Sequence, residues 1–216
     1  MALSKPALVD LYRRRAPRYD LTAQLYYLLG FREWAYRTQA VEALRLRPGA
    51  TVVEIGCGTG LNFTLLQEAV GEEGRIVGVD MTDGMLERAR SRCEDVGWDN
   101  VELVHAEAAS YRFPETVDGV LSTFALTLVP EFDDVIRRGA RALREGGRWV
   151  VADLKLPDAG WQRALLPALL PLFRPFGVTL DLAERHPWES LRRHLDRFGM
   201  EERYFGYTYV AWGEKG

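Results

Sequence analysis

The chain is poor in lysine, histidine and cysteine, and these scarcities limit the kinds of site that it can carry. Only three of its 28 basic residues are lysines, and its 216 residues include three histidines and two cysteines. Cys57 and Cys93 are too few for a disulfide framework and lack the spacing of a metal-binding motif. We therefore expect no metal site, and a reducing, cytoplasmic location.

Long apolar runs are also missing. The longest run, from Ala164 to Phe173, spans ten residues and is interrupted by Pro167, whereas a helix needs about 20 apolar residues to cross a bilayer. The first 20 residues contain no apolar core long enough for a signal peptide. A net charge of −3 argues against a dedicated nucleic-acid-binding protein. The sequence predicts a globular protein that is soluble, or peripheral to a membrane.

Short apolar runs alternate with helical patterns along the middle of the chain, as in a parallel sheet that is covered by helices. Five runs are apolar at nearly every position, which is typical of strands buried on both faces. These predicted strands are Thr51–Ile55, Arg75–Val79, Val101–His105, Val117–Thr123 and Arg148–Leu154.

Helical spacing of apolar residues marks the segments between and after these strands. Helices are predicted from Met85 to Val96, from Phe132 to Leu143, and from Pro187 through Leu195 to Phe198. Residues 201–212 predict a terminal pair of strands around Gly206.

These elements predict one domain, covering residues 1–216. We expect a helical N-terminal lid at residues 1–47, a cofactor-binding core at 48–155, an apolar insertion on the substrate side at 156–180, and the last helix and terminal strands at 181–216. Ligands of open α/β sheets bind at the carboxyl ends of the strands. The segments before the first strand and after the fifth are therefore well placed to cover a ligand.

A glycine-rich loop is the strongest local signal. The sequence Glu54-Ile55-Gly56-Cys57-Gly58-Thr59-Gly60 continues the first predicted strand and leads into a helix. Glycines allow the backbone to turn tightly and to approach a ligand closely. Asp80 ends the second predicted strand, twenty residues after Gly60, and a carboxylate at that place can accept hydrogen bonds from both hydroxyls of a ribose. The pattern predicts a nucleoside cofactor.

Two such cofactors fit this geometry, a nicotinamide dinucleotide and S-adenosylmethionine. The dinucleotide fingerprint requires its third glycine one residue later, where this chain has Leu61. Glu54 also adds negative charge where a pyrophosphate would lie. A ligand with an ammonium and a sulfonium group agrees better with that carboxylate, so S-adenosylmethionine is favoured and a nicotinamide-dependent reductase is the alternative.

The chain resembles the class I S-adenosylmethionine-dependent methyltransferases over residues 45–155. Four segments carry the resemblance: Glu54–Gly60, Val77–Asp80, Val117–Ser122 and Leu143–Arg148. It implies a Rossmann-like α/β fold, with a mostly parallel seven-stranded sheet, helices on both faces and a terminal antiparallel strand pair. The family's third motif is an Asp-Ala pair, and here Glu107-Ala108 replaces it with a longer acid.

The resemblance also implies the roles of individual residues. The glycine loop would cradle the methionine part of the cofactor, Asp80 would hold the ribose, and the segment at Glu107 would contact the adenine. The expected cofactor-binding residues are Glu54, Gly56, Cys57, Gly58, Gly60, Asp80, Met81, Glu107, Ala108 and Ser122.

The sequence indicates the methyl acceptor less directly than the cofactor. The sequence shows no pairing of histidine with aspartate that would indicate a general base. This mildly favours an amine acceptor, because the lone pair of an amine needs no base. Tyr19-Asp20, followed by an aromatic, leucine-rich segment, resembles lipid and quinone methyltransferases. We expect an amine on a phospholipid or betaine-lipid head group, with Tyr19 and Tyr27 orienting it through cation–π contacts. The alternatives are a quinone or another small apolar molecule, and a non-catalytic cofactor-binding partner protein.

Two segments suggest peripheral contact with a membrane. Arg13, Arg14, Arg15 and Arg18 form a cluster that can hold a lipid phosphate or meet an anionic surface. The apolar segment 156–180 can lie in a membrane interface or line an acyl pocket. The alternative interpretation is a solvated basic face and a packing helix.

Overall fold

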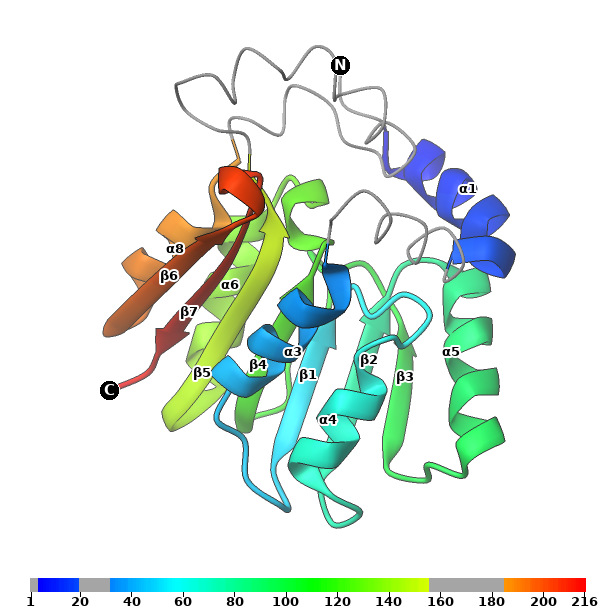
Figure 1. The fold of residues 1–216 in the computed structure, drawn as a ribbon, viewed down its shortest axis with the longest axis horizontal. Helices are drawn as coiled ribbons and strands as arrows, with labels where there is room; N and C mark the ends of the chain where they lie inside the picture. The colour runs from blue at the N-terminus through cyan, green and yellow to red at the C-terminus, as the bar shows by residue number, and fades with distance from the viewer. Residues whose placement is uncertain (1–3, 20–31, 156–184) are drawn as a thin grey trace.

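The computed structural model describes residues 4–19, 32–155 and 185–216 (Figure 1). A single seven-stranded sheet runs through it in the order β3-β2-β1-β4-β5-β7-β6. The strands are β1 (Thr51–Ile55), β2 (Arg75–Asp80), β3 (Val101–His105), β4 (Val117–Thr123), β5 (Leu143–Leu154), β6 (Arg197–Arg203) and β7 (Thr208–Glu214).

The direction of the strands agrees with the predicted fold. Strands β3, β2, β1, β4 and β5 pair in parallel, and β7 lies antiparallel between β5 and β6. The central strands are buried on both faces, and Val52, Val53 and Val120 have no exposed surface. The mostly parallel sheet with a terminal antiparallel pair is therefore confirmed.

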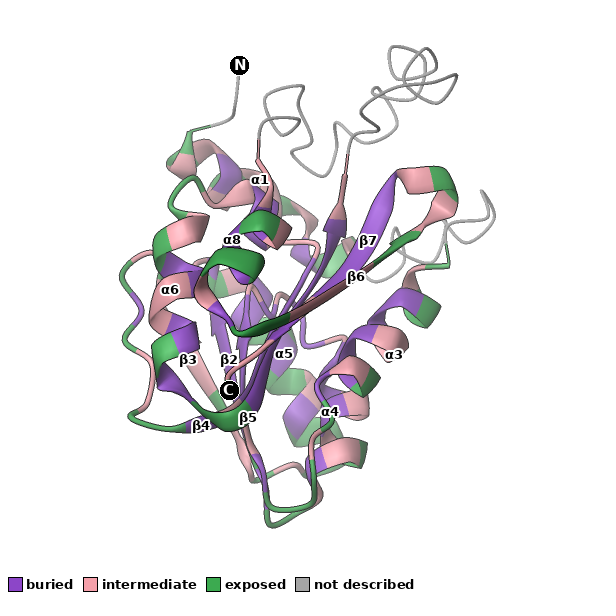
Figure 2. Ribbon diagram, turned by 90° about the vertical axis from the view of Figure 1, so that its left-hand side faces the viewer, coloured by how far each residue is buried: buried purple, intermediate pink, exposed green. Residues whose placement is uncertain are grey.

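Helices cover both faces of this sheet (Figure 2). Helices α3 (Glu33–Ala43), α4 (Phe63–Val70) and α5 (Asp83–Val96) contribute to one apolar core. Helices α6 (Phe132–Ala142) and α8 (Pro187–His194) contribute to a second core on the opposite face. Helix α5 ends as predicted, because Gly97 adopts a left-handed conformation at φ 79° and its N–H bonds to the carbonyl of Cys93.

Helix α1 (Lys5–Arg15) and the short η1 (Ala16–Arg18) lie at the end of the sheet where the parallel strands finish (Figure 1). Arg13 of α1 forms an ion pair with Asp83 at the start of α5, with 2.9 Å between Nε and Oδ1. Arg13 therefore holds α1 against α5. Membrane contact by the arginine cluster stays a prediction.

The structure corrects two of the predicted boundaries. Strand β5 begins at Leu143, before the expected Arg148, because Leu143 already pairs with Val117 of β4. The last helix ends at His194, so Phe198 lies in β6, where it pairs with Gly213. The apolar spacing fits a helix locally, but pairing with β7 satisfies the backbone over the whole of β6. The expected terminal strands are therefore longer and start earlier.

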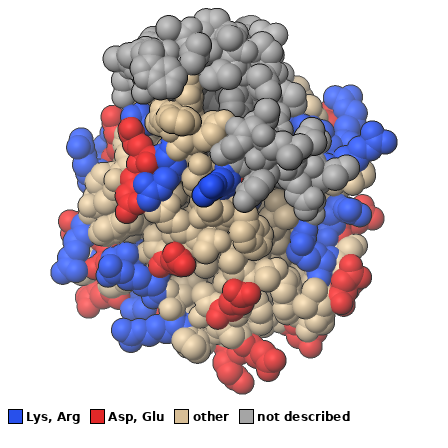
Figure 3. Space-filling view, in the orientation of Figure 1, with Lys and Arg blue, Asp and Glu red and all other residues tan. Residues whose placement is uncertain are grey.

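The surface of the described part of the chain carries both signs of charge. Figure 3 shows blue and red side chains interspersed on one face, most densely around its rim. None of the described helices combines the length and the apolar character that crossing a bilayer requires. The predicted insertion at residues 156–180 lies outside the described residues.

Candidate functional site

A cavity opens at the carboxyl ends of β1, β2 and β4, beneath helix α1. This is the place where open α/β sheets bind their ligands. The glycine loop, the end of β2 and the segment after β3 all contribute to its wall. Seven of the predicted cofactor residues line it: Gly56, Cys57, Gly58, Asp80, Met81, Glu107 and Ala108.

The three loop glycines all have positive φ, but they serve different purposes. The φ values are 71° at Gly56, 55° at Gly58 and 75° at Gly60. A Cβ at Gly56 would lie 2.3 Å from the Cβ of Ala125, and one at Gly60 would lie 2.5 Å from the ring of Phe63. These two glycines permit close packing. A Cβ at Gly58 would meet no described atom within 4 Å, so Gly58 leaves open space on the cavity wall.

Asp80 is fixed by two backbone hydrogen bonds. Its Oδ2 accepts from the N–H of Gly58 at 2.9 Å, and its Oδ1 accepts from the N–H of Thr82 at 2.8 Å. Burial raises the pKa of Asp80, and these hydrogen bonds oppose that shift. A carboxylate has about four acceptor positions, so the group keeps capacity for ribose hydroxyls.

Glu54 lies behind the cavity wall. Its side chain is 1% exposed, and Oε1 accepts a hydrogen bond from the amide of Asn62. Its Oε2 is buried and has no hydrogen-bond partner among the described residues. Burial raises the pKa of Glu54 to about 8. Leaving a buried polar atom unpaired is costly, and a cationic ligand nearby would offset that cost.

Three further expectations have separate outcomes. Gly60 and Ser122 lie outside the described lining of the cavity, and Ser122 is fully buried. Tyr19 lines the cavity together with Tyr12, and their ring centroids are 6.3 Å apart. Burial raises the pKa of Tyr19 to about 12, so its hydroxyl stays protonated and can donate a hydrogen bond. Tyr27 lies outside the described residues.

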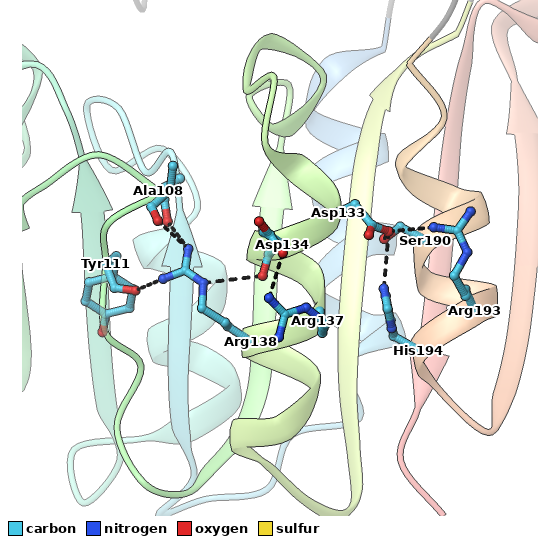
Figure 4. A network of polar contacts seen from close by, with 10 residues as sticks. Ala108, Tyr111, Asp133, Asp134, Arg137, Arg138, Ser190, Arg193 and His194 are labelled. Carbon is cyan, nitrogen blue, oxygen red and sulfur yellow. Dashed lines mark hydrogen bonds and ion pairs between the residues drawn. The ribbon is translucent and has the colours of Figure 1, made fainter.

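The segment at Glu107 is held from two sides. Arg138 of α6 donates hydrogen bonds to the backbone carbonyls of Ala108, Ala109 and Tyr111 (Figure 4). On the outside, Lys5 of α1 pairs with the carboxylate of Glu107 at 3.0 Å. Arg138 therefore sets the position of the loop that the sequence assigns to the adenine.

Arg37 is a charged cavity residue that the sequence did not predict. It comes from α3, lines the cavity, and is 5% exposed. It shares the buried face of α3 with Ala40 and Val41. Arg37 lies three and four residues before these apolar positions, which places it on the same face of a helix. That spacing was the signal that could have identified it as a buried residue.

A pairing of histidine with aspartate does exist, which corrects the sequence analysis. Asp133 of α6 accepts from the hydroxyl of Ser190, and its Oδ1 lies 3.2 Å from Nε2 of His194, both on α8 (Figure 4). Asp133 is the shared centre of this cluster, which joins α8 to α6 and lies outside the described lining of the cavity. It is a structural contact between helices. Within the described residues, no group of side chains is suited to hold a metal ion.

Comparison with known proteins finds similar methyltransferases. A model described as a methyltransferase domain matches residues 52–147. Demethylmenaquinone methyltransferase from Listeria welshimeri is 28% identical over 211 residues, covering 94% of this chain and 88% of the relative. The enzyme of that name from Bacillus cereus is 28% identical over 169 residues, covering 76% of this chain and 70% of the relative.

Solved structures share the fold. A SAM-dependent methyltransferase from Aquifex aeolicus has a TM-score of 0.61 at 20% identity, covering 82% of this chain and 88% of that one. The open space at Gly58 and the unpaired oxygen of Glu54 fit a nucleoside cofactor with a cationic amino-acid part. The strand order, the cofactor loop and the matched domain together support a class I S-adenosyl-L-methionine-dependent methyltransferase.

Proposed function

We propose that the chain transfers the methyl group of S-adenosylmethionine to the ring of a reduced quinone with an apolar tail. The observation that carries this proposal is the extent of the likeness to demethylmenaquinone methyltransferases. The alignment spans 211 residues, whereas the methyltransferase domain accounts for residues 52–147. The likeness therefore includes the segments outside the core, which are the ones expected to meet the acceptor.

The described cavity wall suits a flat, apolar acceptor. Leu8 and Tyr12 of α1 line it, together with Tyr19, Leu128 and Val129. Burial raises the pKa of Tyr12 well above its usual value, as it does for Tyr19. Both hydroxyls therefore stay neutral near pH 7. They can donate hydrogen bonds to a quinol oxygen while their rings pack against its ring.

The chemistry of the transfer places modest demands on the protein. The bound cofactor supplies an activated methyl group with a good leaving group. A quinol ring is electron-rich and can attack that methyl group, whereas the oxidised quinone is electron-poor. The chain's own contribution is to hold the acceptor in line and to exclude water. Because Tyr12 and Tyr19 stay protonated, they would orient the acceptor, and the ring proton that the new methyl group displaces would leave to solvent.

The amine head group expected from the sequence has weaker support. A phosphoethanolamine N-methyltransferase from Haemonchus contortus shares the fold, with a TM-score of 0.62 at 19% identity, covering 78% of this chain and 38% of that one. Fold alone does not specify an acceptor. Tyrosine rings could also hold an ammonium through cation–π contacts, so the two acceptors must be separated by experiment.

An acceptor panel tests the proposal. The purified chain is incubated with methyl-labelled S-adenosylmethionine in one detergent, with a demethylated naphthoquinol or with phosphatidylethanolamine. We expect label in the quinol and none in the amine lipid. Label in the phospholipid alone would overturn the quinol proposal and support the amine.

A pair of tyrosine variants tests the acceptor side of the cavity. Tyr19→Phe removes one donor, and we expect kcat/KM for the quinol to fall about 10-fold. The affinity for S-adenosylhomocysteine should stay unchanged. Tyr111→Phe is the matched control, because Tyr111 is buried in the core and lies outside the described cavity lining. Equal kcat/KM values for the two variants would show that the hydroxyl of Tyr19 does not contribute to the acceptor site.

A further inference from the structure

The chain leaves β4 through a short turn, η2 (Leu126–Leu128), that contributes to one wall of the cavity. Leu128 and the following Val129 line the cavity. The backbone enters this turn through Phe124, whose φ is 54°. A bulky residue in the left-handed region is strained, and such strain persists only where the surrounding structure imposes it. The turn must therefore be held in place by contacts from elsewhere in the fold.

Asp153, near the end of β5, makes the central contact with this turn. Its Oδ2 accepts a hydrogen bond from the backbone N–H of Thr127, in the middle of η2, at 2.9 Å. Its Oδ1 accepts from the N–H of Leu154 at 2.8 Å, and its backbone carbonyl accepts from the hydroxyl of Thr208 on β7 at 2.7 Å. One residue thus joins β5, β7 and the turn.

Two further hydrogen bonds hold the same segment. The N–H of Phe124 donates to the carbonyl of Ala152, the residue before Asp153, at 2.7 Å. The carbonyl of Thr127 accepts from Nη1 of Arg185 at 2.8 Å. The end of β5 therefore fixes both the strained start of the segment and the middle of the turn.

The carboxylate of Asp153 is deeply buried. The residue is 3% exposed, and no arginine or lysine pairs with it in the part of the chain that the structure describes. Burial raises the pKa of Asp153 to about 6, and the N–H groups of Thr127 and Leu154 oppose that shift. Burial also raises the pKa of Tyr12, and the charge of Asp153 adds to this shift. Burying a carboxylate without a counter-ion is costly, so this group has a role beyond packing, close to the tyrosines of the cavity.

We propose that Asp153 is a positioning residue for the methyl acceptor. It fixes η2, so that Leu128 and Val129 form a rigid apolar wall against which the acceptor packs. This role rests on the proposed function only in that the acceptor lies against this wall, and it is the same for a quinol and for an amine lipid. A wall that is ordered in advance spares the acceptor the cost of ordering it on binding.

Amide hydrogen exchange tests the link between Asp153 and the wall without any acceptor. In the unaltered protein the N–H of Thr127 should be among the slowly exchanging amides. Asp153→Asn keeps the size of the side chain but leaves one oxygen to accept from two N–H groups. We expect residues 124–130 to exchange about 10-fold faster in this variant, with β1 and β2 unchanged.

Two outcomes of this measurement would overturn the proposal, whichever acceptor is methylated. One is rapid exchange of the N–H of Thr127 in the unaltered protein, which requires no variant to fold. The other is unchanged exchange of residues 124–130 in Asp153→Asn.

Steady-state kinetics tests the effect on the acceptor. The acceptor is the one that gains label in the acceptor panel, so failure of the quinol proposal leaves this test intact. We expect Asp153→Asn to raise KM for the acceptor about 10-fold, with kcat and the affinity for S-adenosylhomocysteine nearly unchanged. A fall in kcat at constant KM would show that Asp153 acts on the chemical step, which contradicts a positioning role.

A double-mutant cycle with Leu128→Ala tests whether Asp153 acts through the wall. Each single substitution should raise KM for the acceptor. The double variant should raise it little beyond the larger single effect, because residues of one contact network are not additive. Independent effects, in which the two fold-changes multiply, would contradict action through the wall.

Asp118 supplies a matched control. Its Oδ2 also accepts from a backbone N–H, that of Thr51 at 2.8 Å, but it lies at the opposite end of the sheet and outside the described cavity lining. We expect Asp118→Asn to leave KM for the acceptor and the exchange of residues 124–130 as in the unaltered protein. Changes as large as those in Asp153→Asn would show a general loss of stability and overturn the proposal.

Discussion

The carboxylate of Asp80 accepts a hydrogen bond from the backbone N–H of Gly58 at 2.9 Å. Asp80 ends β2 and Gly58 lies in the loop after β1, so this bond joins the two elements that form the cofactor cavity. The ribose side and the loop are thereby fixed relative to one another before any ligand binds. Preorganisation of this kind reduces the cost of ordering the site on binding.

Asp80→Ala should weaken binding of S-adenosylhomocysteine by about 1–3 kcal/mol, because it removes the proposed ribose acceptor and the anchor of the loop. Calorimetry measures the change. Asp95→Ala is the control, since Asp95 is exposed near the end of α5 and lies outside the described cavity lining. Unchanged affinity in Asp80→Ala would show that Asp80 does not bind the ribose.

Gly58→Ala and Gly56→Ala should fail in different ways. A Cβ at Gly58 meets no described atom but enters the cavity, so we expect a folded protein that binds S-adenosylhomocysteine at least 10-fold more weakly. A Cβ at Gly56 would lie 2.3 Å from that of Ala125, and such overpacking costs about 1–3 kcal/mol in the free energy of unfolding. Thermal unfolding and calorimetry separate the two. Normal binding by Gly58→Ala would contradict this account of the loop.

Glu54→Gln should change the dependence of stability on pH. Burial raises the pKa of Glu54 from 4.5 to about 8, so the folded state holds its proton more tightly than the unfolded state. The stability that Glu54 contributes is therefore complete below pH 4.5 and is lost as the pH rises through about 8.

Glutamine cannot ionise, so Glu54→Gln should exceed the unaltered protein in stability at high pH by on the order of 1–3 kcal/mol. The difference should shrink as the pH falls towards 4.5. Denaturant unfolding at several pH values measures it without cofactor. Glu145→Gln, at an exposed position, is the control. Parallel pH profiles for Glu54→Gln and the unaltered protein would show that Glu54 does not titrate in this way.

Arg138→Met should loosen the loop that carries Glu107 and Ala108, because three backbone carbonyls lose their donor. We expect weaker binding of 5′-methylthioadenosine, which contains the adenine, by about 1–2 kcal/mol. Arg137→Met is the control on the same helix, since Arg137 pairs only locally with Asp134 among its described contacts (Figure 4). An equal effect of both substitutions would contradict a positioning role for Arg138.

The cofactor loop could be predicted because its signal is local. Glycines at Gly56, Gly58 and Gly60 follow a buried strand, and their backbone angles depend on immediate neighbours. The positions of the buried strands followed from the same logic, since strands buried on both faces read as continuous apolar runs. These features lie in short stretches of chain, so periodicity and spacing were sufficient.

Contacts between distant parts of the chain could not be predicted in the same way. Arg37 reaches Thr123 across 86 positions, and Ser190 reaches Asp133 across 57. The sequence gives no spacing that joins such pairs. Phe198 is a third case, because its helical spacing was overridden by pairing with Gly213 in the sheet. Tertiary pairing decides such residues, and it becomes visible only in the folded chain.

Locating the transferred methyl group tests the central claim most directly. The chain is incubated with S-adenosylmethionine carrying a deuterated methyl group, in a mixture of demethylated naphthoquinol and phosphatidylethanolamine, and the products are fragmented in a mass spectrometer. The account predicts that the labelled methyl is on the quinone ring system and that Asp80→Ala abolishes the signal at low cofactor concentration. Labelled methyl on the phospholipid nitrogen, or none on either acceptor, would contradict it.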